Sequence, residues 1–302
     1  MDNKKVVTLS EAVSKFIQDG DTIYAAGFTH LIPFAAGHEI IRQAKKDLIL
    51  ARATPDLIYD QIVAAGCARK VIFSYMGNPG VGSLRIVRKQ IETGQLEWEE
   101  YSHFAMISRL QAGATGLPFM PMNPTAAVDL ERENPSYKHI QDPYSGADVV
   151  IVPPLNPDVA IVHVQRADVH GNGQIWGIIG EQKEAAFASG RVILTAEEIV
   201  DEALIRSDPN RTLIPAQIVD AVCHVPYACH PSYTQGYYDR DNAFYLEWDK
   251  ISRSPDLVKQ YLAEWVYGVQ DRSDYWRKLG QETHERLKVA PNPSVPVNYG
   301  RY

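Results

Sequence analysis

The sequence predicts an α/β protein with an open, mostly parallel sheet, helices on both faces of that sheet, and a helical C-terminal region. The first half of the chain supports this prediction, because short apolar runs typical of strands alternate there with segments that have the apolar spacing of helices. Further on, Val149–Pro153 and Val159–Val164 are apolar almost throughout, as is typical of strands buried on both faces. Strands and helices that alternate over short connections favour a parallel sheet, because each helix carries the chain back across the sheet before the next strand begins.

Side-chain caps and glycines mark the predicted helix ends. A cap at Thr8 or Ser10 begins a helix over Leu9–Ile17, and Gly66 ends a helix over Leu57–Ala65. The other predicted helices are Phe34–Ala44, Leu84–Glu92, His103–Thr115 and Glu181–Ala188, and the chain is expected to be mostly helical from Asp249 onward.

The predicted strands fill the intervals between these helices. Besides the two named above they are Thr22–Ala26, Leu48–Ala51, Lys70–Tyr75, Leu96–Tyr101, Arg191–Ala196 and Ile218–Val225. A further strand that begins with Gln174–Gly177 is expected to form a hairpin with Val159–Val164, across a turn rich in glycine. The proline-rich, polar stretch Pro118–Ser145 is expected to be a long ordered excursion.

Residues 1–289 are expected to form one α/β domain, whose helical C-terminal part begins at about residue 249. The final stretch, 290–302, contains Pro291, Pro293 and Pro296 and is predicted to be an extended tail.

Composition limits the possible functions. The 302 residues include 30 Lys and Arg against 37 Asp and Glu, a net charge of −7, which argues against a general nucleic-acid binder because such proteins need a basic face. No apolar run approaches the roughly 20 residues that span a bilayer, and the first residues do not resemble a signal peptide. Three scattered cysteines are typical of a reduced, intracellular chain, so a cytoplasmic location is expected.

A metal site is not expected. Cys223-His224 and Cys229-His230 bring two cysteines and two histidines together, but their spacing does not match the common zinc sites. A buried strand cysteine and a loop histidine are the simpler interpretation.

Two glycine-containing loops are candidates for ligand binding. Gly27, Phe28, Thr29 and His30 follow the first predicted strand, and Gly77–Ser83 follows the third. Ligands of parallel sheets bind where strands lead into helices, and glycine lets the backbone approach a ligand closely. The alternative is that both loops are plain turns, and that His30 is simply hydrogen-bonded rather than a proton carrier.

Carboxylates are the other candidate groups. Glu97, Glu99 and Glu100 surround Trp98 on a predicted strand, where Glu100 and Ser102 share one face, so that one carboxylate could point inward. Glu197-Glu198 is interpreted instead as a charge complement to the start of a following helix. The sequence contains neither a Gly-x-Ser-x-Gly elbow nor a Cys-x-x-Cys pair.

Taken together, several segments resemble the class I coenzyme A transferases, and most closely the A subunit of glutaconate CoA-transferase. The likeness spans about residues 8–290, with the segments in matching order. They are Asp19–Ile23 with Gly27–Thr29, Gly77–Val81, Glu100–Ser102, Ala114–Pro121, Pro157–His163, Ile175–Gly177, Val219–Val222, Pro226-Tyr227, His230-Pro231 and Gly236–Asn242.

This resemblance implies a chain that is active only with a partner. In the family the acyl transfer passes through a glutamyl thioester, and in two-chain members the nucleophilic glutamate lies on the B subunit. It implies a heterodimer or an α2β2 heterotetramer, coenzyme A thioester as substrate and no bound cofactor. The residues it places against the substrate are Gly27, Phe28, Thr29, His30, Asn78, Pro79, Gly80, Val81, Tyr101 and Ser102, with Glu100 as the candidate catalytic residue of this chain.

The sequence departs from the family at two places. Glutaconate-type chains carry Arg-Lys-Pro after the first glycine turn, where this chain has Leu31-Ile32-Pro33, and the family's loop serine is matched by Pro79. Both changes favour a less polar acyl group or a different carboxylate anchor. Two other functions stay open: a CoA-thioester hydrolase or lyase on the same scaffold, in which Glu100 would matter, and a non-catalytic ligand-binding module.

Overall fold

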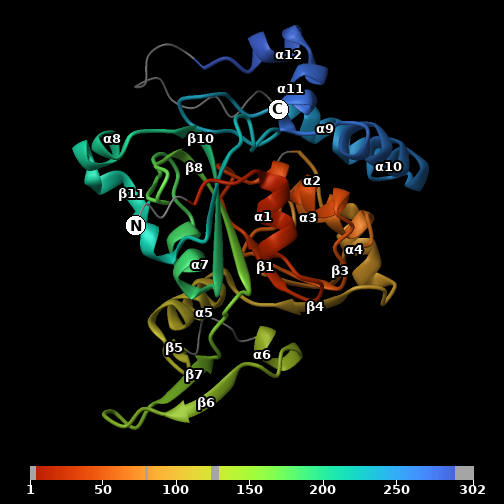
Figure 1. Ribbon diagram of the computed structural model, residues 1–302. Helices are drawn as coiled ribbons and strands as arrows, with labels where there is room; N and C mark the ends of the chain where they lie inside the picture. Colours follow the sequence, from red (N-terminus) through yellow and green to blue (C-terminus); the bar gives the residue numbers. More distant parts are fainter. Residues whose placement is uncertain (1–4, 79–80, 124–128, 290–302) are drawn as a thin grey trace.

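The computed structural model describes residues 5–78, 81–123 and 129–289. The predicted tail, 290–302, lies outside the described residues, as do Pro79 and Gly80. Within the described part, nine strands form one central sheet and three form a smaller one (Figure 1).

The central sheet is open and mostly parallel, as predicted. Its order is β11-β9-β8-β1-β2-β3-β4, and β10 lies against β8 and carries β12 on its other side. The antiparallel contacts are those of β9 with β8 and with β11. The strands are β1 (Thr22–Ala25), β2 (Leu48–Ala51), β3 (Ala68–Phe73), β4 (Glu97–Glu100), β8 (Val159–Ala167), β9 (Gly173–Gln174), β10 (Arg191–Ile199), β11 (Thr212–Ile214) and β12 (Ala221–His224).

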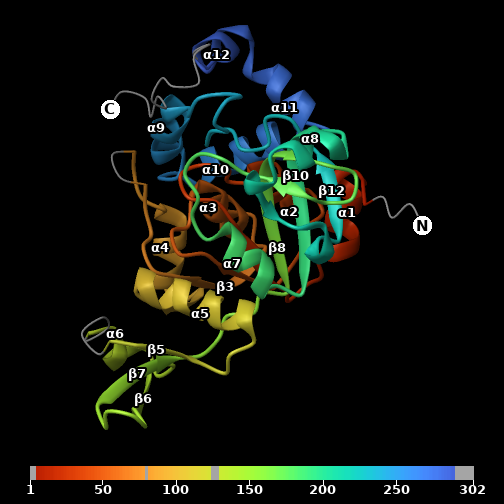
Figure 2. The same cartoon turned by 90° about the vertical axis from the view of Figure 1, so that its left-hand side faces the viewer.

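Helices cover both faces, because alternate residues of each strand point to opposite sides. In β1, Ile23 belongs to one buried apolar cluster and Tyr24 to the other. The first cluster packs against α1 (Leu9–Phe16), α2 (Phe34–Arg42), α3 (Leu57–Ala64), α4 (Arg85–Glu92), α9 (Asn242–Ile251) and α10 (Pro255–Tyr261). The second packs against α5 (His103–Thr115) and α7 (Gln182–Ala188) (Figures 1 and 2).

The stretch predicted as an excursion contains secondary structure. Its elements are β5 (Met120–Met122), α6 (Leu130–Glu133) and β6 (Lys138–Gln141). Both strands pair antiparallel with β7 (Asp148–Val152), and the three-stranded sheet projects from the body of the molecule (Figure 2). Val149–Pro153, predicted as a strand buried on both faces, therefore lies in this separate sheet, where Val149 and Ile151 are only half-buried.

Three other sequence predictions need correction. The expected strand Ile218–Val225 is a 3₁₀ turn, Ala216–Ile218, followed by the shorter β12. The C-terminal helices begin at Asn242, earlier than the expected residue 249, since Asp241 caps α9 by accepting a hydrogen bond from the Phe244 N–H. Strand β10 continues to Ile199, so Glu197 and Glu198 lie within a strand and not at the start of the helix that follows, whose cap is Asp201.

The remaining elements are short and mostly near the C-terminus. They are α8 (Glu202–Ser207), a 3₁₀ turn at Pro209–Arg211, a π-helical segment at Leu262–Tyr267, α11 (Arg272–Leu279) and α12 (Gln281–Arg286). No helix in the described ranges is long and apolar enough to cross a membrane.

Candidate active site

Loops from four adjacent parallel strands meet at the carboxyl edge of the central sheet. The sheet order places β1, β2, β3 and β4 side by side, so the residues that follow them lie at one edge. Gly27–His30 follow β1, Arg52–Thr54 follow β2, the loop from Ser74 follows β3, and Tyr101–His103 follow β4. Ligands of parallel sheets bind at this edge.

The Gly27 loop is a tightly packed turn. Gly27 has a φ of 124°, and a Cβ on it would lie 2.7 Å from the carbonyl oxygens of His30 and Leu31. The buried guanidinium of Arg52 donates a hydrogen bond to the Gly27 carbonyl. Thr29 and Leu31 also have positive φ values, of 55° and 58°. Glycine is therefore required at this position for both conformation and space.

His30 is a structural residue of this loop. Its ring is fully buried, with Nδ1 3.1 Å from the Ile178 carbonyl, and its Nε2 accepts a 3.0 Å hydrogen bond from the Gln235 N–H. Burial lowers the pKa of His30 to about 4. The ring is therefore neutral near pH 7 with both nitrogens occupied, which fits the hydrogen-bonded interpretation rather than a proton carrier.

We expect Gly27→Ala to lower the free energy of unfolding by at least about 2 kcal/mol, because the new methyl group meets two carbonyl oxygens in a conformation that L-residues rarely adopt. Gly190→Ala is the matched control, since a Cβ there would meet its nearest atom at an ordinary 3.4 Å. Urea unfolding of both variants measures the difference. Equal stability of the two would contradict the requirement for glycine at the first turn.

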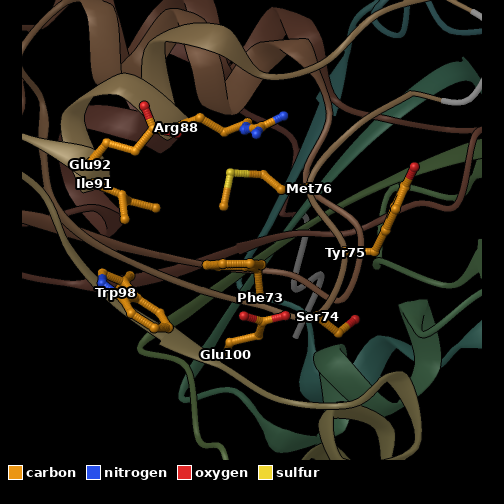
Figure 3. Close-up of a pocket in the computed structure, with 9 residues that line it drawn as sticks. All are labelled: Phe73, Ser74, Tyr75, Met76, Arg88, Ile91, Glu92, Trp98 and Glu100. Carbon is orange, nitrogen blue, oxygen red and sulfur yellow. The ribbon is translucent and has the colours of Figure 1, made fainter. Parts of the chain in front are cut away.

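A pocket of about 390 Å³ opens beside the ends of β3 and β4 (Figure 3). Its size falls in the range of small-molecule sites. Apolar side chains supply much of the wall, with a hydroxyl, a phenol and three charged groups among them. The lining residues are Phe73, Ser74, Tyr75, Met76, Arg88, Ile91, Glu92, Trp98 and Glu100.

Glu100 faces this pocket from the last position of β4 (Figure 3). Partial burial raises the pKa of its carboxyl group, and no ion pair with a described cation offsets that effect. Its neighbour Glu99 points away and binds Lys70 and the Tyr101 hydroxyl, which keeps the pKa of Glu99 below its ordinary value although burial alone would raise it. Because side chains alternate along β4, the Glu100 carboxylate faces the pocket without an ion pair to a described cation, whereas the Glu99 carboxylate faces the other way and is paired with Lys70.

The other predicted substrate residues occupy several environments. Tyr101 is buried, and Ser102 caps α5 by accepting a hydrogen bond from the Ala105 N–H. Asn78 and Val81 are buried in the glycine-rich loop, where the Asn78 N–H donates to the Gly82 carbonyl over 2.9 Å. None of these four lines the pocket, nor do Gly27–His30. Pro79 and Gly80 lie outside the described residues.

The structure brings together three polar residues that the sequence analysis missed. Thr54 Oγ1 lies 2.7 Å from His103 Nε2, and Ser74 Oγ lies 2.9 Å from His103 Nδ1. The Ser74 hydroxyl also donates to the Ala53 carbonyl over 2.6 Å. These residues lie within three positions of the ends of three adjacent strands, β2, β3 and β4, and their closeness to the ends of predicted strands was the available signal.

Glu197 belongs to a buried network behind the loops, in place of the helix-charge role predicted for it. Its carboxylate lies 3.0 Å from His163 Nε2 and accepts hydrogen bonds from the Tyr238 hydroxyl over 2.8 Å and the Tyr227 N–H over 2.7 Å. Although burial alone would lower the pKa of His163, Cys229 and the Glu197 carboxylate raise it to about 10. The pair is therefore charged near pH 7.

No cluster of His, Cys, Asp or Glu in the described ranges is arranged to hold a metal ion. Cys223 and Cys229, considered for zinc from the sequence, are free and buried, as is Cys67.

Residues 6–224 match the family model of coenzyme A transferases, and the chain belongs to this family. It is 48% identical to the A chain of 3-oxoadipate CoA-transferase from Pseudomonas knackmussii, over 92% of this chain and 99% of that protein.

Two solved structures extend the comparison. Glutaconate coenzyme A-transferase from Acidaminococcus fermentans has a TM-score of 0.90 and 36% identity, covering 95% of this chain and 96% of that chain. The decarboxylase AibA/AibB has a TM-score of 0.74 and 30% identity, covering 87% of this chain and 100% of that chain. The predicted likeness to A subunits of the glutaconate type is thereby confirmed.

Proposed function

We propose that this chain is the A subunit of a heteromeric CoA transferase that moves CoA between an acyl-CoA and a free carboxylic acid. The observation that carries the proposal is 48% sequence identity to a CoA-transferase A subunit over nearly the whole chain. The structure of a second CoA-transferase, which matches this chain with a TM-score of 0.90, supports it. A B subunit completes the enzyme, as a heterodimer or an α2β2 heterotetramer, and supplies the nucleophilic glutamate.

The chemistry at the carboxyl edge supports a nucleophile from another chain. Ser74 gives its proton to the Ala53 carbonyl, and both nitrogens of His103 are occupied by hydroxyl groups. Because the Ser74 hydroxyl donates to the Ala53 carbonyl, His103 Nδ1 donates to Ser74. His103 Nε2 accepts from the Thr54 hydroxyl, but neither Thr54 nor His103 lines the pocket. The described lining of the pocket therefore offers no hydroxyl whose proton a histidine accepts. The three cysteines are buried elsewhere. A carboxylate is a suitable covalent nucleophile for splitting one acyl transfer into two easier steps.

Exposed aromatic residues around the edge support a second chain that covers it. Phe28, Tyr75 and Trp98 expose 37%, 49% and 45% of their surfaces. Covering these rings removes apolar surface from water, which is favourable, and closes the pocket over its substrate. In this arrangement the CoA thioester is a substrate, bound between the two chains, and the A chain supplies one wall.

Rapid quench of the A–B complex with labelled acyl-CoA tests the proposal. A transferase accumulates a covalent CoA thioester on a glutamate of the partner, and CoA then passes to the added carboxylic acid. Hydrolysis of the acyl-CoA without an adduct on the partner, and without dependence on the acceptor acid, would contradict transfer.

A hydrolase or lyase on the same scaffold is the second candidate. The observation that favours it is Glu100, a carboxylate that faces the pocket and whose pKa partial burial raises toward the range of a general base. The 30% identity to a decarboxylase shows that this fold is also found in another class of reaction.

We expect Glu100→Gln to cause at most a modest loss of turnover in the A–B complex, because in a transferase the partner's glutamate performs the covalent step. In a hydrolase or lyase the same change removes a general base and costs on the order of 10²-fold or more. Glu92→Gln is the matched control, since Glu92 is the other carboxylate that lines the pocket. Steady-state kcat with each variant decides between the two reactions.

A further inference from the structure

The family's two cations after the first glycine turn have no counterpart in this chain. Leu31 and Ile32 occupy those positions, and both side chains are fully buried. They therefore present neither charge nor surface to a substrate. A dicarboxylic substrate, as the name of the 48% identical relative indicates for that protein, would need a carboxylate anchor elsewhere on this chain.

Arg88 is a cation that lines the pocket beside Glu100. Helix α4 carries two other cations close to it, and both are directed elsewhere. Arg85 forms a 2.8 Å ion pair with Asp249, and Lys89 lines a different pocket, between α4 and α10. Of these three cations, Arg88 is therefore the one available to a ligand in this pocket.

The guanidinium of Arg88 is largely uncommitted. Its one hydrogen bond within the described chain is a long one, 3.3 Å from Nη1 to the Ser83 hydroxyl, and it forms no ion pair with a described carboxylate. Glu92 lies one turn further along α4 and also lines the pocket, yet the two do not form an ion pair. An arginine with free donors can bind a carboxylate through two parallel hydrogen bonds.

The pocket also keeps its cation, Arg88, apart from the Glu100 carboxylate, and this arrangement suits a short-chain diacid. Figure 3 shows Met76 and Phe73 between the side chain of Arg88 and the carboxylate of Glu100. Ile91 and Trp98 add further apolar wall. A substrate carboxylate beside Arg88 is thus kept from Glu100 by apolar side chains, which can pack against the hydrocarbon chain.

From this arrangement we infer that Arg88 binds the distal carboxylate of a dicarboxylic acyl group, the carboxylate that does not react. Arg88 is then a specificity-determining residue that selects dicarboxylic over monocarboxylic acids. The inference rests on the proposed function, because it assigns one part of the substrate of that same reaction.

The test compares two acids of equal chain length, 3-oxoadipate and 3-oxohexanoate, which differ in the distal carboxylate. Equilibrium binding to the purified A–B complex is measured by calorimetry, and KM and kcat for CoA transfer are measured in parallel. The variants are Arg88→Met, Arg88→Lys and, as the matched control, Lys89→Met, which removes a neighbouring charge from α4 outside this pocket. Thermal unfolding checks that each variant folds.

We expect Arg88→Met to weaken binding of 3-oxoadipate, and to raise its KM, by about 10- to 100-fold, the loss of one charge-assisted contact. The Kd for 3-oxohexanoate and the kcat should change little, Arg88→Lys should restore part of the affinity, and Lys89→Met should match the wild type. An equal loss for both acids, or unchanged binding of 3-oxoadipate, would overturn the inference. Failure of the proposed function looks different: the wild-type complex would transfer CoA to neither acid, whatever Arg88 does to binding.

Discussion

Purified without a second subunit, the chain is expected to catalyse no measurable CoA exchange between an acyl-CoA and free carboxylic acids. The described residues that line its pocket include two carboxylates, Glu92 and Glu100, but no thiol and no hydroxyl whose proton a histidine accepts. Removing a covalent nucleophile from an enzyme typically lowers turnover by several orders of magnitude. Adding the B subunit should restore turnover, and the measurement is exchange of label between acyl-CoA and acid, with and without the partner.

A variant partner supplies the control for this experiment. Replacing the B-subunit glutamate that is proposed as the nucleophile by glutamine should leave the complex assembled, as gel filtration would show, but inactive. Robust turnover by the isolated chain, or by the complex with the variant partner, would place the nucleophile on the A chain and would contradict the proposed division of labour.

Glu197→Gln is expected to lower the free energy of unfolding by about 3–5 kcal/mol, because it leaves the buried His163 without its charged partner. Glu197 also accepts hydrogen bonds from the Tyr238 hydroxyl and the Tyr227 N–H, so it ties β10 to the loop that precedes α9. Glu198→Gln is the control, since Glu198 is the next residue of β10 and its ion pair with Arg166 is 45% exposed on the Glu198 side. That change should cost less than about 1 kcal/mol. Urea unfolding at pH 6 compares the two.

The loss of stability caused by Glu197→Gln is expected to depend on pH in a defined direction. His163 has a pKa of about 10 in the folded chain, against an ordinary value of 6.5, so its contribution is complete below pH 6.5 and is lost as the pH rises toward 10. The pKa of Glu197 is lowered from 4.5 by His163, against the effect of burial, so its contribution is lost as the pH falls below 4.5. The stability difference between wild type and Glu197→Gln should therefore be largest between about pH 4.5 and 6.5. A difference that grows from pH 7 to pH 9 would contradict the charged pair.

Several features of the candidate site could be predicted from sequence because their signal is local. Gly27 follows a predicted strand, where a glycine indicates a turn. Its φ of 124° is a conformation that glycine adopts readily and other residues do not. Glu100 and Glu99 alternate on a strand, and this alternation alone indicated that one of the two could face a pocket. The family likeness rested in the same way on short segments in a fixed order.

The surroundings of other residues depend on contacts between distant parts of the chain. The local sequence around Glu197 is typical of an acidic residue before a helix, but a strand that continues to Ile199 carries it into the core, where a histidine 34 residues away neutralises it. Arg88 is one of three cations on a predicted helix, and its place in the pocket is decided by the packing of α4 beside β3 and β4. Likewise, Thr54, Ser74 and His103 become neighbours only because three strands are adjacent in the sheet.

The sequence by itself determined the alternation of strands and helices, the glycine turns and the family, since each of these depends on residue type and spacing along the chain. The tertiary structure decided which carboxylates are free, which cations are available to a ligand, and which strands lie in the central sheet. The physical reason is that charge and burial are properties of a side chain's surroundings. A glutamate is buried and paired, or open to a substrate, according to what the folded chain brings to within hydrogen-bond distance of it.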